Sequence, residues 1–154
     1  MESLEVFILS GCSKLKSIPE FLGPMQNLSV LSLDGTAIEE APPSIECLIG
    51  LISLVLRDCK SLLCLPSVLC SLKSLRSLNM SGCSKLVKFP DSAGQIECLK
   101  ELDLSGTAIS ELPSSIVLMK NLEVLSFRGC KGPPPKSWHL FPPFGSFQKR
   151  PEPA

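Results

Sequence analysis

The eight cysteines are the residues of this 154-residue chain best suited to chemistry. Cysteine pairs can form disulfides or bind zinc, and a single thiolate can act as a nucleophile. Four of the eight recur at one position of a repeating pattern, and the other four lie among apolar residues without the pair spacing of a metal site. The first group is Cys12, Cys59, Cys83 and Cys130, and the second is Cys47, Cys64, Cys70 and Cys98. Because buried cysteine packs as a small hydrophobe, this placement predicts free, buried thiols rather than disulfides or a zinc site.

Other candidate catalytic residues lack partners in the sequence. The single histidine, His139, lies beside Trp138 in a proline-rich segment with no second group for acid–base catalysis. Glu101 and Asp103 are two residues apart and would share one face of a strand, but no histidine or metal-ligand set accompanies them. The phosphate-binding pattern Gly-x-x-x-x-Gly-Lys-Ser/Thr is missing from the sequence. The sequence therefore predicts a chain that is not an enzyme, with no catalytic residue, no cofactor and no metal.

A repeated leucine frame organises these residues. The frame Leu-x-x-Leu-x-Leu recurs, with Phe or Met replacing some leucines, every 23 or 24 residues, within the range of leucine-rich repeats. It starts at Leu4, Leu28, Leu51, Leu75, Leu99 and Leu122. Repeats with Cys at the ninth position are 24 residues long, and repeats with Thr there, at Thr36 and Thr107, are 23. We predict a repeat region over residues 3–130 and a Pro-rich loop or disordered tail over 131–154.

Each repeat predicts the same local structure. Apolar residues at the fourth and sixth positions alternate with other residues, as in a strand. Gly at the eighth position, or Asp58 in the third repeat, permits a tight turn. Each complete repeat has a Pro at the same point, and after it apolar residues come at intervals of three. This spacing favours a short 3₁₀ or extended segment. The predicted fold is an α/β solenoid, a leucine-rich repeat horseshoe with a concave parallel sheet and an irregular or 3₁₀ convex side.

Composition narrows the possible partners. The chain has 15 basic and 15 acidic residues, so no overall field attracts nucleic acid or an anionic membrane. No apolar run reaches the roughly 18 residues that span a bilayer, and residues 1–4 do not resemble a signal peptide. We therefore expect protein partners and a cytoplasmic, possibly nuclear, location. Neither end shows the polar cap that a solenoid needs, and we expect the chain to be a fragment of a longer protein.

Three segments resemble the repeats of a known family. They are residues 9–19 (Leu-Ser-Gly-Cys-Ser-Lys-Leu-Lys-Ser-Ile-Pro), 33–42 (Leu-Asp-Gly-Thr-Ala-Ile-Glu-Glu-Ala-Pro) and 104–116 (Leu-Ser-Gly-Thr-Ala-Ile-Ser-Glu-Leu-Pro-Ser-Ser-Ile). They resemble the leucine-rich repeats of plant intracellular immune receptors of the TIR, nucleotide-binding, leucine-rich repeat class. The resemblance covers about residues 3–138 and implies effector sensing by the parent protein. The nucleotide-binding and NAD-cleaving parts of that class have no counterpart here, and any oligomerisation would occur through those parts.

The open face of the predicted sheet carries the candidate contacts, at the third, fifth and seventh positions of each repeat. Apolar residues on such a face can mark a contact site, and charged ones supply specificity. The candidates are Val6, Ile8, Val30, Asp34, Arg57, Asn79, Glu101, Asp103 and Arg128. Contact with an effector and autoinhibitory contact with the receptor's own nucleotide-binding domain both fit these residues.

Two other functions fit the same repeats. An extracellular receptor or inhibitor-like module is an alternative, because Asn27-Leu28-Ser29 and Asn79-Met80-Ser81 match the glycosylation pattern. The second of these sites would place a glycan in the middle of a predicted strand. A stand-alone, truncated repeat protein is the other alternative, and it would bind a partner without signalling.

Overall fold

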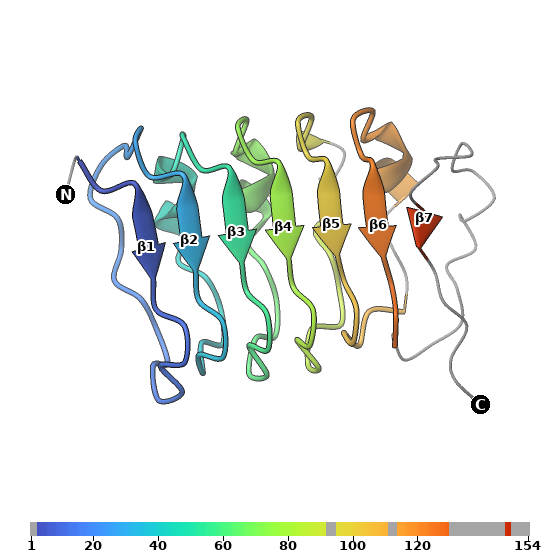
Figure 1. Ribbon diagram of the computed structural model, residues 1–154, viewed down its shortest axis with the longest axis horizontal. Helices are drawn as coiled ribbons and strands as arrows, with labels where there is room; N and C mark the ends of the chain where they lie inside the picture. The colour runs from blue at the N-terminus through green and yellow to red at the C-terminus, as the bar shows by residue number, and fades with distance from the viewer. Residues whose placement is uncertain (1–2, 92–94, 111–113, 130–146, 149–154) are drawn as a thin grey trace.

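The computed structural model describes residues 3–91, 95–110, 114–129 and 147–148 of the chain. The described residues form one parallel sheet of seven strands in the order β1-β2-β3-β4-β5-β6-β7 (Figure 1). Its strands are β1 (Val6–Ile8), β2 (Val30–Ser32), β3 (Ser53–Val55), β4 (Ser77–Asn79), β5 (Glu101–Asp103), β6 (Val124–Ser126) and β7 (Phe147–Gln148). Short 3₁₀ helices lie behind the sheet, and each repeat makes one turn of a regular coil. The predicted leucine-rich repeat solenoid is therefore confirmed.

The strands pair with no slip from one repeat to the next. The middle residue of β1, Phe7, pairs with Leu31, which pairs in turn with Leu54, and the same register continues through Leu125. From Leu31 to Leu125 these middle residues are buried under the sheet. Because side chains alternate across a strand, the residues on either side of each middle residue lie on the opposite, concave face. The third- and fifth-position residues of the repeats therefore line the concave face from β1 to β6.

A left-handed residue follows each of the first six strands. Five glycines take positive φ, from Gly35 at 68° to Gly11 at 81°, and Asp58 takes this conformation in the third repeat with φ 58°. Glycine adopts these angles without steric cost, and Asp is among the few other residues that tolerate them. The predicted turn is confirmed in each of these repeats.

The buried ninth-position side chains satisfy backbone carbonyls. The Thr36 hydroxyl donates to the Leu33 carbonyl of its own repeat at 2.9 Å, and Thr107 makes the same bond to Leu104 at 2.8 Å. The Cys59 thiol instead donates to Leu33, one repeat earlier, at 3.1 Å. Threonine therefore closes its own turn, whereas cysteine links its repeat to the preceding one.

Cys83 repeats the cysteine arrangement one repeat later. Its thiol donates to the Leu56 carbonyl of the preceding repeat at 3.0 Å. A hydrogen bond with Cys59, together with burial, raises the pKa of the Cys83 thiol. The thiol therefore keeps its proton and remains a donor at neutral pH.

The convex side follows the prediction of short 3₁₀ or extended segments. The 3₁₀ helices are η1 (Pro43–Cys47), η2 (Ser67–Ser71) and η4 (Ser114–Leu118). The buried residues of these helices include Ile45, Leu69 and Ile116. Within the described residues, no helix has both the length and the apolar character needed to cross a membrane.

The predicted burial of the cysteines is wrong for part of the set. The seven described cysteines are free thiols, and Cys59, Cys70 and Cys83 are buried as expected. Cys12, Cys64 and Cys98 are exposed, and Cys47 is half-buried. Cys12 holds the same repeat position as Cys59, but it lies in the first described repeat, at the N-terminal end of the stack. The exposure of Cys12 therefore depends on its position at the end, not on residue type.

The structure changes one part of the predicted tail. Within 131–154, Phe147–Gln148 form β7, which pairs in parallel with β6 through Leu125↔Phe147 and Ser126↔Gln148. These two residues are therefore strand and not loop. The rest of 131–154, with His139 and Trp138, lies outside the described residues, as does Cys130.

Candidate protein-binding face

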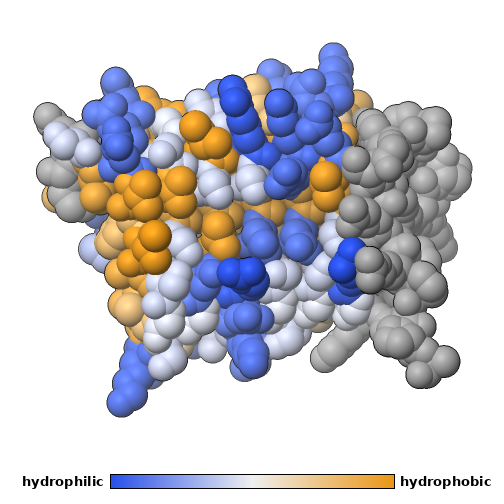
Figure 2. Space-filling model, viewed as in Figure 1, coloured by the Kyte–Doolittle hydropathy of each residue, from blue (hydrophilic) through white to orange (hydrophobic). Residues whose placement is uncertain are grey.

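The concave face divides into an apolar part and a polar part. The apolar part, over β1 to β3, comprises Val6, Ile8, Val30 and Val55. The side chains of Val6 and Ile8 are 48% and 60% exposed, which is high for aliphatic residues. Figure 2 shows apolar surface gathered over this end of the sheet and polar surface over much of the other. We call these four residues the apolar patch.

A polar hollow of about 240 Å³ lies on the same face over β4 to β6. Its rim brings together four of the residues predicted as contacts, which come from different repeats. They are Asn79, Glu101, Asp103 and Arg128, with Ser77, Ser105 and Ser126 between them. The repeats thus gather residues that lie up to 51 positions apart in sequence, since Ser77 and Arg128 share one hollow.

Short hydrogen bonds hold the polar side chains of the hollow in place. The Asn79 Oδ1 atom accepts from the Ser81 amide at 2.9 Å and from the Ser81 hydroxyl at 2.8 Å. Asp103 Oδ1 accepts from the Ser105 amide at 2.9 Å. Each bond spans two residues, from the fifth to the seventh position of one repeat, as in an Asx turn. The hollow therefore presents carboxylate and amide groups in fixed orientations.

An ion pair lies between the apolar patch and the hollow. Arg57 Nη2 donates to Asp34 Oδ2 at 3.0 Å across neighbouring repeats. The Arg57 side chain is half exposed, so the pair contributes at most about 1 kcal/mol to stability. The other carboxylate oxygen of Asp34, Oδ1, accepts a hydrogen bond from the Ser32 hydroxyl at 3.2 Å. The Ser32 hydroxyl also forms a hydrogen bond with the Ser10 hydroxyl at 2.9 Å. Asp34 is therefore committed to neighbours, while Arg57 keeps donors available for a partner.

All nine predicted contact residues fall on the concave side of the stack. Seven of them lie in the two regions, the other two, Asp34 and Arg57, form the ion pair between the regions, and none is fully buried. The sequence prediction did not include Val55, which holds the fifth position of its repeat and lies in β3. The same repeat period that placed Ile8 at the fifth position could have identified it.

The described part of the chain offers little for catalysis. Among its residues, no group of three or more His, Cys, Asp or Glu side chains is arranged to hold a metal ion. Glu101 and Asp103 face solvent on an open surface and are not enclosed in a pocket with a nucleophile. The arrangement suits contact with a protein surface.

Comparison with known proteins decides the family. The family model for RPS4B-like disease resistance protein leucine-rich repeats matches residues 1–89, and a general leucine-rich repeat model matches residues 98–119. The chain is a leucine-rich repeat region of the plant disease resistance protein family. It is 41% identical over 132 residues to TMV resistance protein N of Nicotiana glutinosa, a match that covers 85% of this chain and 12% of that protein. It is also 46% identical over 72 residues to RPP2B of Arabidopsis thaliana, covering 47% and 6% of the two chains.

Solved structures share the fold of these disease resistance repeats. The leucine-rich repeat domain of the type III effector XopL has a TM-score of 0.74 and 29% identity, covering 86% of this chain and 48% of that one. A leucine-rich repeat protein of Leptospira interrogans has a TM-score of 0.70 and 32% identity, covering 77% and 30%. Fold and family are those of non-enzymatic binding modules.

Proposed function

We propose that the concave face is the recognition surface of a plant immune receptor, and that it contacts either a pathogen effector or the receptor's own nucleotide-binding domain. The observation that carries this proposal is the exposed apolar patch beside a polar hollow on one open sheet face. Apolar side chains such as Val6 and Ile8 supply affinity once a partner covers them. The oriented groups of the hollow supply specificity, because an unmatched partner leaves them desolvated and unpaired.

The two partners predict different consequences of the same change. An autoinhibitory contact keeps the receptor silent, so weakening it produces a defence response without a pathogen. A contact with an effector leaves the receptor silent when it is weakened and removes the response to that effector. Both partners act inside the plant cell, and we propose a cytoplasmic, possibly nuclear, location on this basis. In the extracellular alternative a glycan at Asn79 would enter the hollow, and the Oδ1 atom of that side chain is already bonded to Ser81.

The test reverses charge on the concave face and, as a control, at two exposed lysines that do not line the hollow. The chain replaces the matching 132 residues of TMV resistance protein N, and leaves expressing the chimaera are scored for cell death. The test variant is Arg57→Glu with Arg128→Glu, and the matched control is Lys73→Glu with Lys120→Glu, two exposed lysines that share a repeat position. Both variants change the net charge equally.

Three outcomes separate the hypotheses. Spontaneous cell death with the arginine variant alone supports autoinhibitory contact. Silence combined with lost response to the trigger of the unmodified chimaera supports effector contact. If the arginine and lysine variants behave alike, in silence and in response, the concave face is not the recognition surface and the proposal is wrong.

A further inference from the structure

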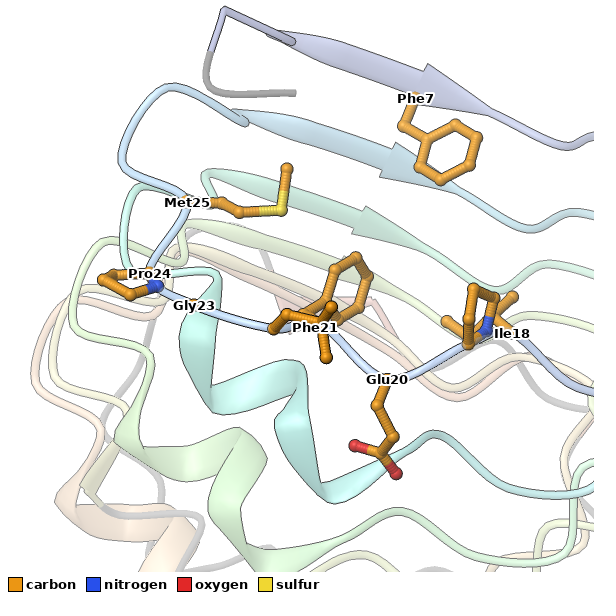
Figure 3. A pocket seen from close by; sticks show the side chains of 9 residues that line it. Phe7, Ile18, Glu20, Phe21, Gly23, Pro24 and Met25 are labelled. Carbon is orange, nitrogen blue, oxygen red and sulfur yellow. The ribbon is translucent and has the colours of Figure 1, made fainter.

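The ninth-position cysteines of the third and fourth repeats lie in the closed part of the interior. In the first repeat, Phe7 points from β1 toward the segment that carries Phe21 and Met25, and a groove of about 600 Å³ lies between them (Figure 3). In the middle of the stack, Cys59 and Cys83 are completely buried. These two thiols contact only protein atoms, so their neighbours decide what they can do.

The two thiols lie beside each other in neighbouring repeats. Cys83 Sγ donates to the Leu56 carbonyl oxygen at 3.0 Å, and the same oxygen accepts the Cys59 amide at 3.3 Å. The Cys83 sulfur is therefore held against the backbone of the residue that carries the other thiol. The two side chains are also within hydrogen-bonding reach of each other. No third group needs to move for the two sulfur atoms to meet.

The backbone around the pair has the spacing that a disulfide requires. β3 and β4 pair without slip, and beyond them the Asp58 amide donates to the Ser81 carbonyl at 2.8 Å. Pairing of the two repeats thus continues to the residue before Cys59, and neighbouring chains in such a sheet are about 4.8 Å apart. The Cα atoms of a disulfide are about 4.4 to 6.8 Å apart. The separation of the two repeats falls within this range.

We propose that Cys59 and Cys83 are a modification site, a thiol pair that closes to a disulfide between the third and fourth repeats when a peroxide oxidises the folded chain. The Cys59 sulfur attacks hydrogen peroxide, an S–O bond forms, the O–O bond breaks, and one water leaves. The Cys83 sulfur then attacks the Cys59 sulfur, the S–S bond forms, the S–O bond breaks, and a second water leaves. The two sulfurs are oxidised, both thiol protons end in water, and the peroxide is reduced.

The surroundings assign a different role to each thiol. A hydrogen bond from the Cys83 side chain lowers the pKa of the Cys59 thiol, and burial opposes this shift only in part. The same hydrogen bond, together with burial, raises the pKa of the Cys83 thiol. The thiolate is the nucleophilic form of cysteine. Cys59 is therefore the thiol that reacts with peroxide, and Cys83 keeps its proton until it attacks the oxidised sulfur.

The disulfide leaves no buried carbonyl without a donor. Cys59 Sγ must turn away from the Leu33 carbonyl, to which it donates at 3.1 Å. That oxygen still accepts the Thr36 hydroxyl at 2.9 Å and the Thr36 amide at 3.2 Å. The Leu56 carbonyl loses the Cys83 thiol but keeps the Cys59 amide. The desolvation cost of an unpaired carbonyl, which would oppose the reaction, is therefore avoided.

Peptide mapping tests the proposal in the full chain carrying Cys12→Ser, Cys64→Ser and Cys98→Ser, because these exposed thiols would otherwise react first. The folded, reduced protein is treated with hydrogen peroxide, unfolded in the presence of an alkylating reagent and digested with trypsin. Digestion releases residues 58–60 and 77–85, which carry one thiol each. We expect these two peptides to be joined by a bond that dithiothreitol cleaves.

Two further substitutions in this chain form a matched pair. Cys59→Thr introduces the residue that Thr36 and Thr107 provide at the same repeat position, so it keeps the turn and removes the attacking thiol. It should abolish the linked peptide. Cys70→Ser removes another buried thiol, in η2, and should leave the linked peptide unchanged. Circular dichroism before oxidation confirms that each variant is folded.

Stability provides a second measurement on the same samples. A disulfide that fits the native structure restricts the unfolded chain, so the oxidised protein should have a urea midpoint about 1 M above that of the reduced protein. Dithiothreitol should reverse this rise. The rise should be absent from the Cys59→Thr variant and present in the Cys70→Ser variant.

Four results would overturn the thiol-pair proposal. The first is recovery of Cys59 and Cys83 as alkylated thiols after peroxide treatment. The second is sulfinic or sulfonic acid at either residue without a linked peptide, and the third is linkage of either residue to another cysteine. The fourth is a linked peptide with a lowered urea midpoint, because the folded repeats would then not accommodate the bond. These results do not depend on the concave face, so they leave the proposed function to its own test.

Discussion

The interior below the sheet and the concave face above it differ in composition, and the three residues of β5 belong to both. Leu102 points under the sheet and is buried, whereas Glu101 and Asp103 point to the concave face and reach solvent. The interior below the sheet is nearly uniform from repeat to repeat, with leucine as the middle residue of β2 to β6. The concave face changes from aliphatic to charged across the same strands. One region therefore specifies the fold, and the other is free to specify a partner.

The largest expected effect is in the interior. Leu102→Ala removes a fully buried side chain that packs between two neighbouring repeats and leaves a cavity. We expect a loss of about 2 to 5 kcal/mol in the free energy of unfolding. Urea denaturation followed by circular dichroism measures this loss. A loss below about 1 kcal/mol would mean that the repeats do not share one continuous core.

The next largest loss of stability is expected at the glycines of the turns, where Gly11 and Gly82 can be compared directly. Gly82 and Gly11 have φ near 80°, so alanine is strained at both. A Cβ on Gly82 would also meet the Asp58 carboxylate of the preceding repeat, whereas one on Gly11 would meet open space. We expect Gly11→Ala to cost about 1 to 2 kcal/mol from strain alone. Gly82→Ala should cost more, and equal losses in urea unfolding would show that stacking at this turn is loose.

The sequence predicted the interior better than the concave face, for a physical reason. Leu and Gly positions repeat because each repeat must cover the next, so periodicity alone located the strands, the turns and the 3₁₀ segments. The same period placed the nine candidate residues on the concave face, but the hollow depends on local bonds such as the one from the Ser81 amide to Asn79. The sequence did not reveal β7, because Phe147–Gln148 lie outside the leucine frame. It also failed for Cys12, whose repeat position predicts burial but whose place at the end of the stack prevents it.

Substitution at the ninth position of a repeat should lower the free energy of unfolding by a smaller amount. Thr107→Val keeps the shape of the side chain and removes the donor to the Leu104 carbonyl. That carbonyl still accepts the Thr107 amide at 3.3 Å, so the expected loss is about 1 kcal/mol. Thr107→Ser keeps the hydroxyl and serves as the control for the hydrogen bond. If valine proves no worse than serine in urea unfolding, the hydroxyl bond does not stabilise the turn.

The smallest effect on stability should come from the concave neighbour of Leu102. Glu101→Ser introduces the residue that Ser77 already provides at the same position one repeat earlier, and the ladder bonds of β5 are all made by backbone atoms. Surface changes of this kind shift the free energy of unfolding by no more than about 0.5 kcal/mol. The comparison within one strand is then direct, because Leu102→Ala and Glu101→Ser alter adjacent residues and should differ by several-fold in cost. A loss above about 1.5 kcal/mol for Glu101→Ser in urea unfolding would show that the concave face also holds the fold together, and its side chains could not then vary freely to suit a partner.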